Sequence, residues 1–130
     1  MEPRPSIAAL RIGRNDTPLG CFTLEYADIP DKLDLGPDAQ ALDADRAGEK
    51  LAVRTRRPGD RVQLLGSTGS KLVSDVLTDK KVPRALRDRV PLIERDGEIL
   101  WIAGIAPYAP CAIGPGSRRA LIIKYTRPKE

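Results

Sequence analysis

Apolar residues gather in short stretches along this chain, several of which alternate with polar residues as strands do. The predicted strands cover residues 6–12, 20–26, 40–45, 51–55, 92–94, 98–103 and 120–125. The dipeptide Asp96-Gly97 favours a tight turn, so the strands on either side of it should form a hairpin. The stretch at 120–125 is apolar enough to be central in a sheet. The pattern therefore predicts a β-rich chain.

Turn-forming residues separate these stretches. Gly13, Asn15, Asp16 and Pro18 predict a loop between the first two strands. Residues 28–39 are polar with two prolines and a glycine, which predicts an irregular connection, and residues 104–117 are predicted as a loop because they are rich in Gly, Pro and Ala.

Helical spacing occurs twice. Residues 71–79 predict a short amphipathic helix with Ser70 as its N-cap. A second short helix should follow, with Pro83 at its first position and Pro91 beyond its end. The apolar side of the first helix would consist of Leu72, Val73, Val76 and Leu77.

The fold class predicted from these elements is α+β, a mixed or antiparallel β-rich domain with two short helices. The 130 residues are 41% hydrophobic, enough for one modest core. We expect an acidic N-terminal β-hairpin and connecting segment over residues 1–41, followed by the main domain over 42–130.

Charged residues are distributed unevenly along the chain. Residues 1–50 carry six basic and ten acidic side chains, whereas residues 51–130 carry sixteen basic and eight acidic ones. Between Arg54 and Arg89 ten Lys or Arg residues stand against four Asp, without an evident reaction centre. A structured, strongly basic segment is typical of a surface that holds a polyanion.

Several classes of site are excluded or disfavoured. The chain has no histidine, which excludes Ser-His-Asp and Cys-His catalysis and histidine metal sites within it. Cys21 and Cys111 form no Cys-x-x-Cys motif and are expected to be free thiols, with a disulfide as the alternative. Asp43 and Asp45 share a strand face, but no neighbour in the sequence would raise their pKa or bind a metal with them. No apolar run reaches membrane-spanning length and no signal peptide is visible, so the cytoplasm is the expected compartment.

The basic side chains fall in two groups. In the strand at 51–55 the alternation places Arg54 and Arg56 on one face, before a turn at Pro58-Gly59, and Asp60 is expected to engage one arginine and leave the others available. The alternative is a mostly solvated group of charges. The second group is the densest basic cluster and consists of Lys80, Lys81, Arg84, Arg87 and Arg89.

Two further features have competing interpretations. Residues 66–71 (GSTGSK) precede the first helix and could contact phosphate through backbone N–H groups, but the P-loop spacing is absent, and a flexible entry loop explains them equally well. Trp101 could stack on a base, although its apolar neighbours favour a core position.

A collinear set of motifs resembles a known family. They are Leu-x-Val-Arg-x-Arg-x-x-Gly-Asp-Arg at 51–61, Gly69-Ser70-Lys71, Asp75, Asp79-x-Lys81-Val82-Pro83, Arg87-Asp88, Pro91-Leu92 and GEILWIAG at 97–104. In this order and spacing they resemble the C-terminal domain of tRNA(Ile)-lysidine synthetase, and Leu42-Asp43-Ala44-Asp45 is similar to that family's lead-in strand. Leu72, Ser74 and residues 105–108 (IAPY) depart from the family's more basic pattern.

The resemblance implies a fold shared with the phenylalanyl-tRNA synthetase beta chain and a role in gripping tRNA, chiefly at the acceptor stem. The parent enzyme is a ligase that uses ATP and lysine to convert the wobble cytidine of an isoleucine tRNA to lysidine. ATP and lysine would belong to its N-terminal catalytic domain, whose Ser-Gly-Gly-x-Asp-Ser loop does not occur in this chain. No cofactor or metal is expected here.

We therefore expect residues 42–130 to be a non-catalytic tRNA-binding domain whose partners are tRNA and the catalytic domain of the same enzyme. The expected phosphate contacts are Arg54, Arg56, Arg61, Lys71, Lys81, Arg84 and Arg87, with Gly59 and Gly69 shaping the loops that present them. The main alternative is a docking module that packs its basic face on the catalytic domain without RNA contact. A small nucleotide-using enzyme is a third hypothesis that depends only on residues 66–71.

Overall fold

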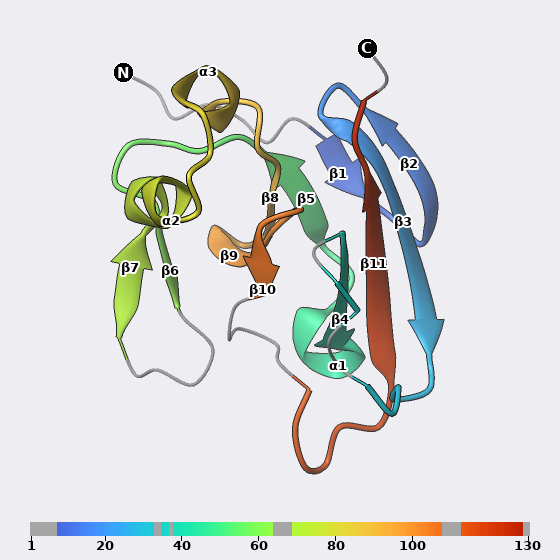
Figure 1. The fold of residues 1–130 in the computed structure, drawn as a ribbon. Coiled ribbons are helices and arrows are strands. Elements are labelled where there is room, and N and C mark those ends of the chain that lie inside the picture. Colours follow the sequence, from blue (N-terminus) through green and yellow to red (C-terminus); the bar gives the residue numbers. More distant parts are fainter. Residues whose placement is uncertain (1–7, 33–34, 37, 64–68, 108–112, 129–130) are drawn as a thin grey trace.

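The computed structural model describes residues 8–32, 35–36, 38–63, 69–107 and 113–128. Its strands form three antiparallel sheets, and three short helices accompany them (Figure 1). The first sheet, with strand order β1-β5-β8-β9-β10, consists of β1 (Ala8–Leu10), β5 (Leu51–Arg54), β8 (Leu92–Arg95), β9 (Glu98–Ile102) and β10 (Ala106–Pro107). The second, with order β2-β3-β11-β4, consists of β2 (Gly13–Thr17), β3 (Gly20–Ala27), β11 (Ala120–Thr126) and β4 (Ala39–Asp43). The third is the ribbon of β6 (Arg61–Gln63) and β7 (Ser70–Leu72).

The helices are α1 (Ala44–Ala47), α2 (Val73–Asp79) and α3 (Arg84–Arg87). The predicted fold class, an antiparallel β-rich α+β domain, is confirmed.

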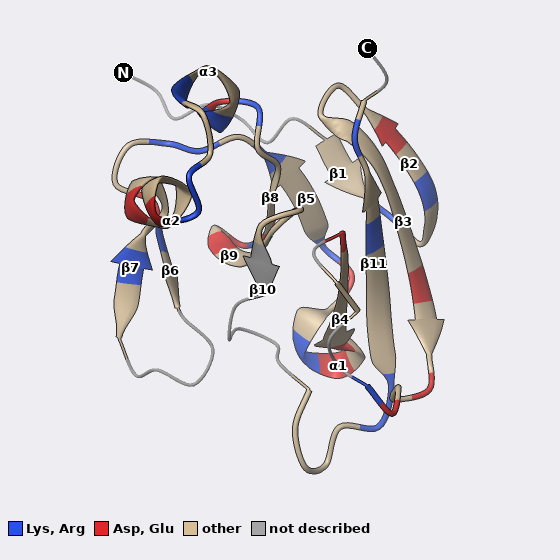
Figure 2. Ribbon diagram, viewed as in Figure 1, with Lys and Arg blue, Asp and Glu red and all other residues tan. Residues whose placement is uncertain are grey.

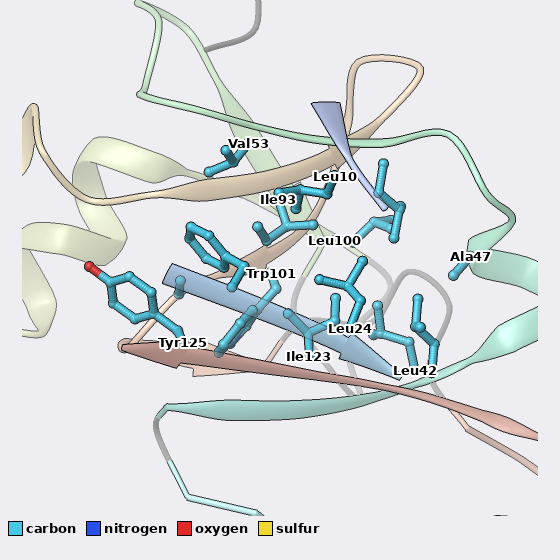
Figure 3. Close-up of a cluster of buried hydrophobic side chains, with 14 of the residues drawn as sticks. Leu10, Leu24, Leu42, Ala47, Val53, Ile93, Leu100, Trp101, Ile123 and Tyr125 are labelled. Carbon is cyan, nitrogen blue, oxygen red and sulfur yellow. The ribbon is translucent and has the colours of Figure 1, made fainter. Parts of the chain in front are cut away.

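The main core lies between the two larger sheets. In Figure 3, Val53, Ile93 and Trp101 of the five-stranded sheet project toward Ile123 and Tyr125 of the four-stranded sheet. Phe22 and Tyr125 stack with ring centroids 5.0 Å apart. Burial of these apolar surfaces is the main force that holds the two sheets together.

A second core covers the other face of the five-stranded sheet. Val73, Val76 and Leu77 of α2 and Val62 of β6 pack there. The molecule therefore has three layers, with the five-stranded sheet in the middle (Figure 1). Because the middle sheet is covered on both faces, β8 and β9 contribute buried apolar residues to both cores.

A β-bulge in β9 explains why consecutive apolar residues are all buried. Ile93 pairs with Trp101 and Glu94 pairs with Ile99, so Leu100 is the extra residue. Leu100 and Trp101 both face the main core, while Ile99 and Ile102 face the second one. The predicted hairpin is confirmed, and its turn residues Asp96 and Gly97 both have positive φ, as a primed turn requires.

The region around Ser70 differs from the prediction. Residues 70–72 form β7, and α2 begins only at Val73 after Leu72, which provides no side-chain cap. The hydroxyl of Ser70 accepts from Nε of Arg61 at 2.8 Å instead of capping the helix. The amide of Val73 donates to the carbonyl oxygen of Asp60 at 2.9 Å, so a distant backbone group replaces the expected cap.

The predicted loop at Gly13–Thr17 is a strand. Its polar residues include Asn15, which is buried and donates through Nδ2 to the carbonyl oxygens of Arg11 (2.9 Å), Gly13 (3.1 Å) and Phe22 (3.2 Å). The amide of Arg11 in turn donates to Oδ1 of Asn15 at 3.0 Å. One side chain thus stabilises the corner where the chain leaves β1 and enters β2.

The expected strand at 40–45 is shorter, because Asp43 ends β4 and caps a third helix, α1. Its Oδ1 accepts from the amides of Asp45 (3.0 Å) and Arg46 (3.2 Å). The described residues therefore contain three short helices, one more than the sequence predicted.

Strands from both sides of the expected division at residue 41 pair with one another. β1 pairs with β5, and β3 and β4 both pair with β11. Leu10, Phe22 and Leu24 lie in the same core cluster as Trp101. The described residues on either side of position 41 therefore share their sheets and their core.

Candidate nucleic-acid interface

The corner between α2 and α3 is held by a Schellman motif. The amide of Lys81 donates to the carbonyl oxygen of Thr78 and the amide of Val82 to that of Leu77, both at 3.0 Å. Lys81 takes the left-handed backbone conformation of this motif, with φ of 56°. Glycine is the usual residue there because a side chain costs about 1–2 kcal/mol in this conformation.

Helix α3 projects from this corner and buries none of its residues (Figure 1). Arg87 helps to hold it, because its Nε donates to the carbonyl oxygen of Val82 (2.9 Å) and its Nη1 to the hydroxyl of Thr78 (3.2 Å). Leu86 is 48% exposed on the same helix. The helix is presented to solvent and contributes no side chain to either core.

Four cations around α3 are exposed. Lys80, Lys81, Arg84 and Arg89 form no ion pair among the described residues. Figure 2 shows basic residues gathered along α3 and the loops beside it. We call these four residues the α3 cation cluster. It holds two of the expected contacts, Lys81 and Arg84, and adds Lys80 and Arg89, which the density of basic residues over 80–89 had already indicated.

The remaining expected contacts have partners in the structure. Nε of Arg56 donates to Oδ1 of Asp88 at 2.9 Å, and Lys71 forms an ion pair with Asp79. Arg61 bonds the hydroxyl and the carbonyl oxygen of Ser70. These contacts are exposed or half-buried, and such surface ion pairs contribute at most about 1 kcal/mol, so a phosphate can compete for the cations.

Arg54 departs from the expectation. Its side chain is 3% exposed and does not project into solvent beside Arg56. Nε donates to Oε2 of Glu94 at 2.7 Å, and Nη1 and Nη2 donate to the two carboxylate oxygens of Asp60 at 2.8 and 3.0 Å. Burial alone would lower the pKa of Arg54, but the hydrogen bonds to both carboxylates outweigh it and raise the pKa above its usual value.

Strand alternation failed at Arg54 because β5 is covered on both faces, so a residue that points away from the main core is still buried. The expectation that Asp60 engages one arginine side chain is confirmed for Arg54. With its guanidinium enclosed by protein acceptors, Arg54 is left out of the surface that we consider for RNA.

The two glycines expected to shape loops lie at different places. Gly59 has a φ of 83° in the turn between β5 and β6, a conformation that favours glycine. Gly69 directly precedes β7. Residues 66–68 of the GSTGSK segment lie outside the described residues, and Lys71 at its end pairs with Asp79.

Other candidate chemistry finds no support among the described residues. Trp101 is 1% exposed in the main core, which confirms the core interpretation. The described residues contain no group of three or more His, Cys, Asp or Glu side chains that could hold a metal ion. Their helices are too short or too polar to cross a membrane. Cys21 is a half-buried free thiol, and Cys111 lies outside the described residues.

Comparison with known proteins identifies the family. Residues 51–114 match the model of the TilS substrate C-terminal domain. The chain is 41% identical over 96 residues to a tRNA(Ile)-lysidine synthase of Symbiobacterium thermophilum and 35% identical over 102 residues to one of Geobacillus kaustophilus. These matches cover 74% and 78% of the chain, but only 20% and 22% of the two enzymes.

A solved structure of a TilS C-terminal domain decides the assignment. It superposes with a TM-score of 0.75 at 32% identity, over 98% of this chain and 95% of that one. The chain belongs to the TilS C-terminal domain family. The resemblance inferred from the motif string is thereby confirmed, and the match to the solved TilS domain includes β1 to β4, which precede the family-model match. The chain spans about a fifth of the length of the TilS enzymes named above.

Proposed function

We propose that this chain is the non-catalytic tRNA-binding domain of a cytoplasmic tRNA(Ile)-lysidine synthase. The observation that carries the proposal is the α3 cation cluster, four exposed cations on and beside a helix that buries none of its own residues. Each cation can neutralise a phosphate, and phosphate contacts supply most of the affinity and fix the register of a bound nucleic acid. The ATP, the lysine and the chemistry of the ligase would belong to the catalytic domain of the parent enzyme.

The proposed tRNA surface is centred on the α3 cation cluster. Arg56, Arg61, Lys71 and Arg87 flank it and can exchange their present partners for phosphate oxygens. Arg84 and Arg89 provide the cleanest test because neither makes a hydrogen bond that holds the corner, unlike Arg87.

The test is binding of a labelled isoleucine tRNA transcript, measured by fluorescence anisotropy at several salt concentrations. Neutralising four phosphates should give a slope of about −3 in a plot of log affinity against log salt. Arg84→Glu with Arg89→Glu should weaken binding at least about tenfold, or about 1.4 kcal/mol. The matched control is Lys32→Glu with Lys50→Glu, which makes the same charge change at exposed positions outside α2 and α3.

Two results would contradict the proposal. One is a salt slope near zero for the unmodified chain, and the other is an equal loss in the α3 variant and in its control. An equal loss would mean that total charge governs the interaction, and not the cluster.

Docking on the catalytic domain is the second candidate function, and the exposure of Leu86 on α3 favours it. An apolar side chain within a basic surface is the kind of residue that a protein partner would cover. Mixing this chain with the catalytic domain in the absence of RNA, followed by sedimentation analysis, separates the two. A stable complex that Leu86→Ser disrupts would support docking.

A further inference from the structure

The ion pairs of Arg54 join β5 to β8 and to the turn that follows β5. The buried guanidinium lies between Glu94 of β8 and Asp60 of the turn after β5, and its Nη1 also donates to the carbonyl oxygen of Thr55 at 3.0 Å. Glu94 and Asp60 are themselves 9% and 14% exposed. Buried ion pairs are seldom more stable than apolar side chains of the same size, so stability alone is a weak reason for this arrangement.

Asp60 connects that ion pair to the basic surface. Its Oδ2 accepts from the amide of Arg57 at 2.6 Å, and its own amide donates to the carbonyl oxygen of Arg57 at 3.1 Å. Its carbonyl oxygen accepts from the amide of Val73, the first residue of α2. A single residue thus fixes the turn at 55–60 relative to both β5 and α2.

Arg56 connects this turn to α3 through an ion pair. Arg56 lies in the turn that Asp60 holds. Its Nε donates to Oδ1 of Asp88, the C-cap residue of α3, at 2.9 Å. The turn and α3 are 32 positions apart in the chain at this contact. The conformation of the turn therefore determines the position of the Arg56 guanidinium relative to the α3 cation cluster.

We propose that Arg54, Asp60 and Glu94 are positioning residues for tRNA binding. They bind no phosphate themselves and fix the turn so that Arg56 and the α3 cation cluster form one continuous surface. This inference rests on the proposed function. Under this proposal two acidic residues, Asp60 and Glu94, favour the binding of a polyanion. Their charges alone would predict the opposite effect. Preorganisation of this kind reduces the ordering cost at the moment of binding.

The experiment is a double-mutant cycle on tRNA affinity with the complete 130-residue chain. Asp60→Asn keeps the size of the side chain and removes its charge. We expect it to weaken binding about fivefold, although it makes the chain more positive, and to reduce the salt slope by about one unit, as loss of one phosphate contact does. In an Arg56→Gln background the same change should weaken binding less than about twofold, whereas in an Arg84→Gln background the full loss should remain.

These outcomes separate positioning from general stability. Urea unfolding of each variant establishes that it is folded under the binding conditions, and if Asp60→Asn is not, the same cycle with Glu94→Gln decides. Tighter or unchanged binding by the folded variant would overturn the inference, and so would an equal loss in both backgrounds. A failure of the proposed function looks different, because the unmodified chain would then bind without salt dependence.

Discussion

Lys81 and Thr78 are joined by a backbone hydrogen bond of 3.0 Å that places a lysine where a helix usually ends in glycine. The left-handed φ of 56° is unfavourable for any residue with a Cβ atom. Side chains that keep such a conformation are frequent at functional sites. The exposed, unpaired ammonium group of Lys81 fits that explanation within the described part of the chain.

Lys81→Gly should therefore change the stability of the fold and the affinity for tRNA in opposite directions. We expect the free energy of unfolding to rise by about 1 kcal/mol, because the backbone strain is relieved. Affinity for tRNA should fall at least about threefold, because one cation is lost. Urea unfolding and anisotropy measure the two effects. The control is Lys80→Gly at an ordinary φ of −85°, which should weaken both properties. A less stable Lys81→Gly variant would refute the strain argument.

Substitution of Trp101 tests its core position. Trp101→Phe should lower the free energy of unfolding by about 1–2 kcal/mol, because it leaves a void between the two large sheets. The affinity for tRNA should change less than about twofold, since the indole does not reach the surface. Circular dichroism in urea and anisotropy provide the two values. A large loss of affinity in a fully folded variant would point to base stacking instead.

Loss of Asn15 should destabilise the corner between β1 and β2. Asn15→Ala removes the partner of three backbone carbonyl oxygens and of one amide, and we expect a cost of about 2 kcal/mol. The neighbouring Arg14→Ala removes only an exposed ion pair with Asp16 and should leave the free energy of unfolding almost unchanged. Equal unfolding free energies for the two variants would show that the corner is not held by Asn15.

Asp43 should make stability depend on pH in the acid range. A hydrogen bond from the hydroxyl of Ser117 at 2.7 Å, aided by the amides of Arg46 and Asp45, holds the pKa of its carboxyl below the ordinary value. Because the folded-state pKa is the lower one, the carboxylate contributes stability above its unfolded-state pKa of about 3.9. That contribution is lost as the pH falls through the folded-state pKa.

The measurement is urea unfolding of the unmodified chain and of Asp43→Asn between neutral pH and about pH 2.5. The difference between the two should be largest near neutrality and should shrink toward the acid end. Asp31→Asn, a change of the same charge at an exposed loop position, is the control. A difference that stays constant with pH would contradict the assigned linkage.

Local signals in the sequence predicted those parts of the fold that local physics governs. The dipeptide Asp96-Gly97 was enough to predict the β8–β9 hairpin. The spacing of Val73, Val76 and Leu77 was enough to predict the buried face of α2. Strand β2 was missed because its residues favour turns, and pairing with β3, aided by the hydrogen bond from Asn15 to Phe22, keeps them extended. Non-local contacts of this kind leave no trace in the local pattern.

The same limit applies to the candidate surface. The charge density over residues 80–89 located the α3 cation cluster, since charges close together in the chain are also close in space. Arg54 could not be distinguished from Arg56 by sequence, because its partner Glu94 lies 40 positions away. Whether a basic residue is exposed or enclosed is decided by layers that assemble only in the folded state.

The pairing of β1 with β5 has a practical consequence for anyone who shortens this chain. A piece limited to residues 51–114, the extent of the family match, would lack β1 and every strand of the four-stranded sheet. Leu51 and Val53 would face water, and the open backbone edge of β5 would be a template for aggregation. The smallest soluble version should therefore begin before Ala8 and continue past Thr126.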